Sequence, residues 1–424
     1  IPDSLKSLLP SPEIPVNDFI VLNLPEQSES LVSYPAPKWF CSEAPSSTLD
    51  GALIFDIVSK KSIPPTNTLT TLRDAIGQEW LDGAKLVIDP RFKSRRPLPL
   101  WVVTLWRMLA DIKDKQETWK DAQHFVAMEV SKRNVHPHYP TVESVLGDVP
   151  WNGEVQSGTF MFPTHRFSQL LRPDQLCDDI TQAMTAVLQE QCKGDDGSHR
   201  GNMIAASRFY SAIQVAVERN RLGDGKKLPQ LLKAVEDATS RNPKLKLWFP
   251  VLYRSHEIVV CVDFGKNVVI YGDSIAVMPP PTLVMNTIQK WLKARYKKTF
   301  GFEGNQLPHG DQEDAISCIP CTVNTISHGV FGDQIWTHEL RFVDRFRWFR
   351  RLVHGGDVPN PPNISLSNSQ PNVVRPSLTN LLNPTEEVVF QDLIEFLEME
   401  IRDENDTRGG ASGEGGDGRK TKKD

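Results

Sequence analysis

The chain has 424 residues, 39% of them hydrophobic, and a formal net charge of −5 at neutral pH. A chain of this length is expected to form two or three structural units rather than one average domain. The small negative charge excludes a protein that binds nucleic acid over its whole surface. The 32 prolines indicate long irregular stretches between the folded units.

The cysteines are too few and too scattered to predict a disulfide-bonded secreted domain. We therefore expect free thiols and an intracellular protein. No run of 18 apolar residues is present, and the first residues lack the pattern of a signal peptide, so no membrane partner is expected. The chain begins with Ile1 rather than methionine, which is typical of a fragment. The six cysteines are Cys41, Cys177, Cys192, Cys261, Cys318 and Cys321.

Residues 1–160 are expected to form a separate N-terminal region, rich in proline at first and helical later. Up to about residue 66 we predict irregular backbone with brief strands at 19–22 and 52–58. From about 70 to 133 the apolar residues recur at helical spacing. No motif in this region indicates its role.

Residues 161–355 predict an α+β domain in which helices flank a small central sheet. A first helix is expected to carry Pro173 in its first turn, because proline is tolerated there. Short β-branched runs at 248–253, 258–263 and 268–271 predict strands, and a turn at 264–267 joins the last two. Further helices are expected at 203–219, 228–239, 284–292, 319–326 and 340–353.

The remainder of the chain reads as a linker at 356–384, followed by an acidic helix and a polar tail at 385–424. The linker is rich in proline, asparagine and serine, and the tail is rich in glycine and charge, which is typical of disorder. The basic residues 419–423 are a candidate nuclear-import signal, and a solvated tail is the alternative.

Cys318 has the sequence context of a reactive thiol. A thiol becomes nucleophilic when a helix N-terminus or a neighbouring imidazole lowers its pKa. Pro320 is tolerated only in the first turn of a helix, and Val323 and Ile326 continue in helical phase, so Cys318 should begin that helix. The alternative is a buried structural cysteine, because free cysteines are among the most buried residues.

His256 and Asp273 stand at the far ends of two strands that a short turn joins. Antiparallel strands bring such ends together, so the two side chains should be neighbours, and the carboxylate would fix the imidazole tautomer. Gln312 is a candidate oxyanion donor together with the backbone N–H of Cys318. Each residue alone could be an ordinary polar residue, but together they are the groups that a cysteine hydrolase needs.

The order and spacing of these residues resemble those of the ubiquitin-like-protein-specific proteases, which are SUMO-protease-like and adenain-like cysteine peptidases. His256 and Asp273 are 17 positions apart, and Gln312 precedes Cys318 by six. Residues 248–251, 270–274 and 175–180 also resemble the family's strands around its His and Asp and its upstream helix. The resemblance covers roughly 161–355, and the transposon-associated fungal branch looks closest.

This resemblance implies a papain-like (adenain-like) fold and a thiol protease that needs neither metal nor organic cofactor. Cys318 would be the nucleophile, His256 the general base, Asp273 its orienting partner and Gln312 the oxyanion donor. The implied partner is a ubiquitin-like modifier such as SUMO, or a protein modified by one. Nucleic acid is not expected as a partner of this domain.

Several positions depart from the family pattern, among them Ser317, which stands where the family has an aspartate before the cysteine. Gln175 and Glu257 replace tryptophans that roof the tunnel for the modifier's Gly-Gly tail, and Ile319 replaces a glycine. We expect these two polar residues to line a more open channel, with Trp248 compensating in part, and standard SUMO or ubiquitin substrates to be cleaved weakly. The alternative is a catalytically inactive relative that binds a modifier or a transposon-encoded partner.

Two further motifs have an ordinary explanation. Cys318 and Cys321 have redox or metal-motif spacing, but no second cysteine pair and no βαβ context accompany them, so Cys321 is expected to be buried one turn into the helix. Residues 341–351 alternate arginines with aromatic residues, which could contact nucleic acid or an acidic protein. We predict instead an amphipathic helix with a solvated basic face.

Overall fold

The computed structural model describes residues 9–28, 34–43, 51–91, 97–131, 139–158, 160–194, 199, 201–223, 228–275 and 280–354. The predicted linker at 356–384 and the predicted helix and tail at 385–424 lie outside these residues.

A five-stranded mixed sheet forms the centre of the second half of the chain, in the order β10-β9-β8-β7-β6. The three middle strands are antiparallel, and each edge strand runs parallel to its neighbour. The predicted middle strands are confirmed, whereas the two edge strands were not predicted. The strands are β6 (Asn202–Ile204), β7 (Lys246–Tyr253), β8 (His256–Asp263), β9 (Val268–Gly272) and β10 (Gly301–Asn305).

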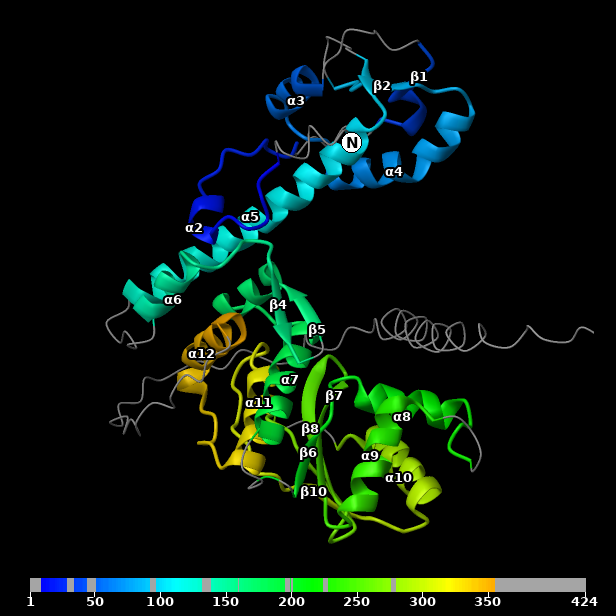
Figure 1. Ribbon diagram of the computed structural model, residues 1–424, viewed down its shortest axis with the longest axis vertical. Helices are drawn as coiled ribbons and strands as arrows, with labels where there is room; N and C mark the ends of the chain where they lie inside the picture. The colour runs from blue at the N-terminus through cyan, green and yellow to red at the C-terminus, as the bar shows by residue number, and fades with distance from the viewer. Residues whose placement is uncertain are drawn as a thin grey trace, which may run out of the picture.

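Helices cover both faces of this sheet (Figure 1). One face carries α8 (Phe209–Glu218), α9 (Gln230–Arg241) and α10 (Thr282–Tyr296), and the other carries α7 (Asp178–Gly194), α11 (Cys318–Phe331) and α12 (Arg341–His354). Successive side chains of a strand point to opposite faces. Along β8, Val260 and Val262 therefore join the core under α8–α10, while Val259 joins the core under α7 and α11. The predicted α+β class is confirmed.

Helix α11 packs against the sheet at Gly329, where the absence of a side chain leaves room for a ring from β7. A Cβ at this position would come within 2.3 Å of the Trp248 ring, which packs there from β7. Thr322 of the same helix donates a hydrogen bond of 2.9 Å from Oγ1 to the carbonyl oxygen of Glu257 on β8. These contacts fix the start of α11, at Cys318, beside the start of β8, at His256.

The N-terminal part has a core of its own, made by α3, α4 and the first half of α5. Helix α5 then runs out of this unit towards the second half of the chain (Figure 1). The elements up to residue 146 are α2 (Val16–Phe19), η1 (Ala36–Lys38), β1 (Phe40–Cys41), α3 (Gly51–Ser59), α4 (Thr66–Leu81), β2 (Leu86–Val87), β3 (Leu98–Pro99), α5 (Val102–Ser131) and α6 (Tyr139–Leu146). Of these, α2 and α6 pack on the core of the second half.

The hydrophobic core of the second half does not stop at the predicted boundary near residue 160. The second half of α5 belongs to it: Trp119 packs edge-on against Phe349 of α12, and Phe125 packs against Phe342. The hairpin of β4 (Glu154–Ser157) and β5 (Phe160–Pro163) and the short helix η2 (Thr164–Leu171) pack on the same core. The part of the chain with a separate core is therefore shorter than residues 1–160.

Several local predictions were wrong. Residues 52–58 form helix α3 rather than a strand, because Ile54 and Val58 share one helical face that is buried in the N-terminal core. Residues 19–22 lie at and beyond the end of α2. Helix α7 begins at Asp178, with two acidic residues in its first turn, and not near Pro173. Residues 202–204 form β6, so the helix expected from 203 begins at Phe209.

Candidate active site

His256 and Asp273 form a buried pair at one end of the sheet. His256 is the first residue of β8 and Asp273 follows the last residue of β9, and His256 Nε2 lies 2.8 Å from Asp273 Oδ1. Oδ1 of Asp273 also accepts a hydrogen bond of 2.9 Å from the backbone N–H of Ile275, which fixes the carboxylate. The predicted proximity of the two residues is confirmed. With Nε2 bound to the carboxylate, Nδ1 on the other side of the ring is the nitrogen that could exchange a proton with a thiol.

Cys318 is the first residue of α11, as the position of Pro320 predicts. Its side chain is only 4% exposed, and burial raises its pKa to about 11, with a further upward contribution from the Glu257 carboxyl. Hydrogen bonds from the backbone of Glu257, Ile319 and Cys318 itself act in the opposite direction. The thiol is therefore protonated at neutral pH, and it contacts the backbone of the residue that follows His256.

A hydrogen bond between the thiol and the imidazole, which we expected, is not among the contacts of Cys318 within the described residues. Among the residues that the structure describes, no hydrogen bond joins Cys318 Sγ to the His256 ring. The neighbouring backbone groups of Glu257 and of the first turn of α11 take that place instead.

Gln312 lies next to the His256–Asp273 pair, because the residue after Asp273 holds it on two sides. Its backbone N–H donates to the carbonyl oxygen of Ser274 over 3.0 Å, and its Oε1 accepts a hydrogen bond of 2.7 Å from Ser274 Oγ. Nε2 donates to the carbonyl oxygen of Asp314 over 2.7 Å. The side-chain amide is therefore held in one orientation, with one of its two N–H bonds used.

Asp314, which is not among the residues predicted from the sequence, organises the loop between Gln312 and Cys318. Its Oδ1 accepts hydrogen bonds from the backbone N–H groups of Ile316 (3.0 Å) and Ser317 (2.9 Å), and its Oδ2 accepts one from Ser317 Oγ (2.8 Å). Aspartates favour such local bonds to the backbone that follows them. The sequence feature that could have indicated this role is an aspartate four positions before the predicted start of the helix.

Glu257 is buried, which corrects the expectation that it lines an open polar channel. Next to His256 on β8, it points into the layer between the sheet and α7, where its Oε2 accepts a hydrogen bond of 3.0 Å from Thr181 Oγ1. Burial raises the pKa of Glu257 to about 8, and the neighbouring Asp178 adds to this effect, while the Thr181 hydroxyl opposes it. The carboxyl is thus mostly neutral at pH 7.

Gln175 and Trp248, the other two expected substrate-binding residues, have opposite surroundings. Gln175 is exposed, and its Nε2 donates a hydrogen bond of 3.2 Å to the carbonyl oxygen of Ser255, the residue before His256. Trp248 is 4% exposed, packs on Gly329 and donates from Nε1 to Asn202 Oδ1 over 3.0 Å. The expectation that Trp248 lines a substrate channel is therefore wrong, because its place on β7 faces α11.

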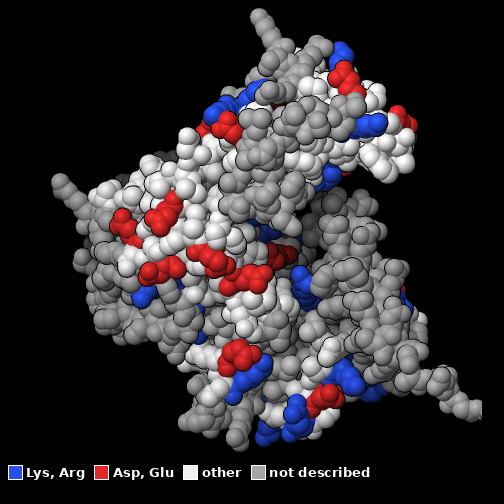
Figure 2. Space-filling model, turned by 45° about the horizontal axis from the view of Figure 1, so that its top comes forward, with Lys and Arg blue, Asp and Glu red and all other residues white. Residues whose placement is uncertain are grey.

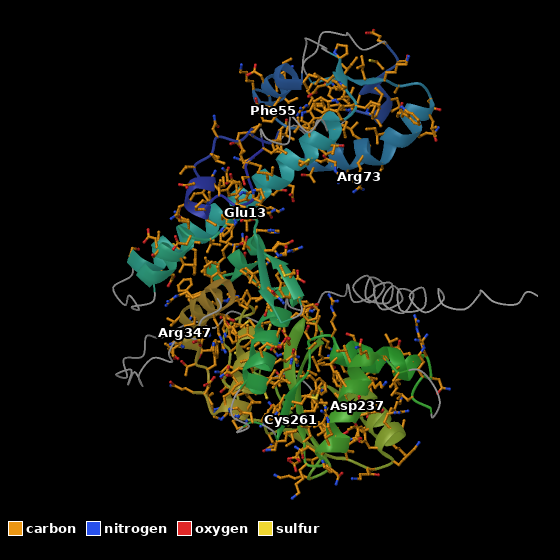
Figure 3. The ribbon with its side chains drawn as sticks, viewed as in Figure 1. Glu13, Phe55, Arg73, Asp237, Cys261 and Arg347 are labelled. Carbon is orange, nitrogen blue, oxygen red and sulfur yellow. The ribbon has the colours of Figure 1, made fainter. Side chains whose placement is uncertain are left out.

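The basic face predicted for residues 341–351 is not fully solvated. Helix α12 forms as predicted, but Arg345 is 0% exposed, and its guanidinium donates hydrogen bonds to the backbone carbonyls of Arg172, Asp174 and Ile316. Burial lowers the pKa of Arg345 to about 10, so it remains charged at neutral pH. Arg347, on the same helix (Figure 3), is labelled there, and its guanidinium pairs with Asp344 over 2.6 Å.

The other cysteines near the site have the surroundings of structural residues. Cys321 is 1% exposed, one turn into α11 as predicted, and its thiol interacts with the Ser274 hydroxyl, while burial raises its pKa. Cys261 lies in the middle of the sheet (Figure 3), where burial raises its pKa to about 12. Of these three thiols, that of Cys318 stands at a helix start beside a histidine.

Within the described ranges, no three histidine, cysteine or acidic side chains are grouped so that they could hold a metal ion. No helix in these ranges is long and apolar enough to cross a membrane.

The surface charge is unevenly distributed on the face shown in Figure 2. Acidic side chains gather across the middle of this face, and basic ones lie mostly towards its edges. The visible described surface of that face therefore does not offer one continuous basic area.

Comparisons with known proteins gave structural matches alone. No family model matches the sequence, and no curated protein matches it. The structure is similar to the X-ray structure of the C-terminal Ulp1 protease domain in complex with Smt3, the yeast ortholog of SUMO. That match has 16% sequence identity, covers 52% of this chain and 96% of the other, and has a TM-score of 0.38.

Two other solved structures are similar at comparable levels. The catalytic domain of the Chaetomium thermophilum Ulp1-like SUMO protease is 16% identical, with 43% of this chain and 73% of the other covered and a TM-score of 0.35. The Xanthomonas campestris effector protein XopD, bound to ubiquitin, is 14% identical, with 41% and 90% covered and a TM-score of 0.27. Because these TM-scores lie below 0.5, the family resemblance rests on the residues of the site.

Proposed function

We propose that this protein is a cysteine peptidase or isopeptidase that acts on a ubiquitin-like modifier or on a protein that carries one. The observation that carries the proposal is the buried His256–Asp273 pair, with 2.8 Å between Nε2 and Oδ1, beside the helix that begins at Cys318. The order and spacing of these residues, which resemble the ubiquitin-like-protein-specific proteases, support the choice of substrate class.

In the proposed mechanism, Nδ1 of His256 takes the proton of the Cys318 thiol, and the sulfur attacks the scissile carbonyl carbon. Asp273 holds Nε2, orients the ring and stabilises the imidazolium that forms. The oxyanion receives hydrogen bonds from Gln312 Nε2 and the backbone N–H of Cys318. The amine leaves with the proton from His256, and water activated by the same imidazole then hydrolyses the thioester.

The burial of Cys318 favours general-base catalysis over a preformed thiolate. A thiol with a pKa near 11 has almost no thiolate at pH 7, so its proton must be removed as the bond forms. A neutral Glu257 assists this step, because an ionised carboxylate beside the sulfur would raise the thiol pKa further.

A second candidate function is binding without cleavage. It is favoured by the 4% exposure of Cys318 and by the upward shift of its pKa, both of which also suit a structural cysteine. Ile319 adds bulk where close approach of a substrate backbone would be needed. A protein of this kind would dock a modifier or a partner protein through the same fold and leave it intact.

Steady-state hydrolysis of C-terminal fluorogenic derivatives of SUMO and of ubiquitin tests the proposed function. We expect weak but measurable hydrolysis of at least one substrate, because the exposed Gln175 stands where the resembled family has a tryptophan over the tunnel. Replacing His256 with alanine should lower kcat/KM about 100-fold or more, since the general base is lost. His124→Ala, which changes an exposed histidine on α5, is the control and should leave the rate unchanged.

The outcome separates the two candidates. Hydrolysis that is the same with and without the His256 imidazole would contradict the proposed mechanism. Saturable binding of a modifier by the wild-type protein, with no hydrolysis at any concentration, would instead support the binding-only function.

A further inference from the structure

The buried guanidinium of Arg345 connects segments that lie far apart in the sequence. It donates to the carbonyl oxygens of Arg172 and Asp174, in the connection between η2 and α7, and over 3.1 Å to that of Ile316, two residues before Cys318. Charge-assisted hydrogen bonds of this kind are stronger than neutral ones, and the planar fork of arginine presents its donors in fixed directions. The guanidinium therefore sets the spacing between these two backbone segments.

The segment that Arg345 holds on one side leads directly to the general base. Gln175, the residue after Asp174, donates its Nε2 hydrogen bond of 3.2 Å to the carbonyl oxygen of Ser255, which precedes His256. Ser255 is in the left-handed region at φ 58°, so this turn is a strained position that benefits from an external contact. Arg345 thus binds the backbone two residues before Cys318 directly, and it connects to the residue before His256 indirectly, through Asp174 and the side chain of the adjacent Gln175.

The helix that carries Arg345 is itself rigidly held. The side chains of Phe346 and Phe349 are 0% exposed, and Phe349 packs edge-on against Trp119 of α5. Lysine could not replace this arrangement, because an ammonium group on a flexible stem lacks the fork that spans several carbonyls.

We propose that Arg345 is a positioning residue, which holds the backbone before the nucleophile Cys318 in register with the backbone before the general base His256. This inference rests on the proposed function for its catalytic consequence, while the positioning itself can be measured without a substrate. Arg345 reaches neither the substrate nor the reacting atoms, and acts through the two loops.

The test compares Arg345→Gln and Arg345→Lys with a control variant, Arg347→Gln. The control removes a different guanidinium of the same helix, the one that pairs with Asp344. The first measurement is hydrogen–deuterium exchange of the intact chain. Arg345→Gln should speed the exchange of amides at 255–257 and at 316–318 about tenfold or more, while Arg347→Gln should leave both segments as in the wild type. If Arg345→Gln does not fold, Arg345→Lys, which keeps the charge and the stem, is measured in its place.

The second measurement is steady-state hydrolysis of the modifier substrate that the wild type cleaves. Arg345→Gln should lower kcat about tenfold or more with KM changed less than about threefold, because misplaced groups affect the chemical step rather than binding. Arg345→Lys should recover only part of the loss. A purely structural role would lower the melting temperature of both Gln variants but leave kcat per folded molecule unchanged.

The two measurements distinguish a failure of the positioning role of Arg345 from a failure of the proposed peptidase function. Unchanged exchange in both segments of a folded Arg345 variant would overturn the positioning role, whatever the activity. A kcat equal to that of Arg347→Gln would also overturn it. A wild-type protein that hydrolyses no modifier would refute the proposed function, and the exchange measurement would still decide whether Arg345 positions the two loops.

Discussion

Replacing Cys318 with alanine is expected to abolish hydrolysis, whereas replacing Cys321 with alanine should leave most of it. Cys318 is the first residue of α11 and contacts the backbone next to His256, while Cys321 lies one turn further on and interacts with Ser274. Loss of the nucleophile in enzymes with an assembled catalytic group costs on the order of 10⁶ in kcat. The measurement is kcat/KM of both purified variants beside the wild type.

The melting temperature of each variant is the control for this comparison. Both cysteines are buried, so each loss should cost a similar, modest amount of stability, about 1–2 kcal/mol. A similar melting temperature with a very different activity identifies the nucleophile. Equal loss of activity in the two variants would contradict this account and favour chemistry that uses the Cys318–Cys321 pair as a dithiol.

Glu257→Gln is expected to stabilise the protein at high pH and to change its stability little at pH 5. The buried carboxyl has a pKa near 8 when folded, against an ordinary value of 4.5. Below pH 4.5 it is protonated in both states and carries no penalty. As the pH rises to 8, the unfolded state gains stability by ionising, so the folded protein loses stability, at about 1.4 kcal/mol for each pKa unit. A glutamine amide avoids this loss, and its oxygen can still accept the Thr181 hydrogen bond.

Thermal unfolding of wild type and variant at pH 5 and pH 8.5 measures this difference. A gain of a few kcal/mol corresponds to a rise of roughly 5–10 °C in melting temperature for a domain of this size. Glu154→Gln, which changes an exposed carboxylate on β4, is the control and should show no such pH dependence. A Glu257→Gln variant that is equally or less stable than the wild type at pH 8.5 would contradict a buried, neutral carboxyl.

The parts of the fold that were predictable carry a strong local signal. The interiors of β7 and β8 are continuous apolar runs, and β8 and β9 are rich in β-branched residues, because helices cover both faces of the sheet. The start of α11 could be placed at Cys318 because Pro320 fits only the first turn. The proximity of His256 and Asp273 followed from a short turn between antiparallel strands.

The parts that were missed depend on contacts between distant segments. Strands β6 and β10 have only three and five residues and form by hydrogen bonding to β7 and β9. Their own sequences show no clear alternation of apolar and polar residues. Residues 52–58 are apolar enough for a strand or a helix, and the N-terminal core decides for the helix. Trp248 was assigned to a channel because sequence alone does not show that Gly329 makes room for it.

In the candidate site, too, some residues could be predicted from the sequence and others could not. Its four chemical groups could be recognised from residue type and spacing, but the residues that hold them could not. Asp314 acts through the loop between Gln312 and Cys318, and Arg345 reaches a carbonyl oxygen 173 positions away in the chain. The burial of Glu257 was also hidden, because a glutamate is rarely placed inside a core and nothing in its sequence context indicates the Thr181 hydroxyl.

Covalent capture by a ubiquitin-like modifier with a C-terminal electrophile tests the central claim most directly. The modifier is incubated with the wild type and with Cys318→Ala, Cys321→Ala and His256→Ala, and the labelled residue is identified by peptide mass spectrometry. We predict a single adduct at Cys318 that is kept in Cys321→Ala, much slower in His256→Ala and absent in Cys318→Ala. An adduct at another cysteine, or binding without any adduct, would contradict a Cys318 nucleophile activated by His256.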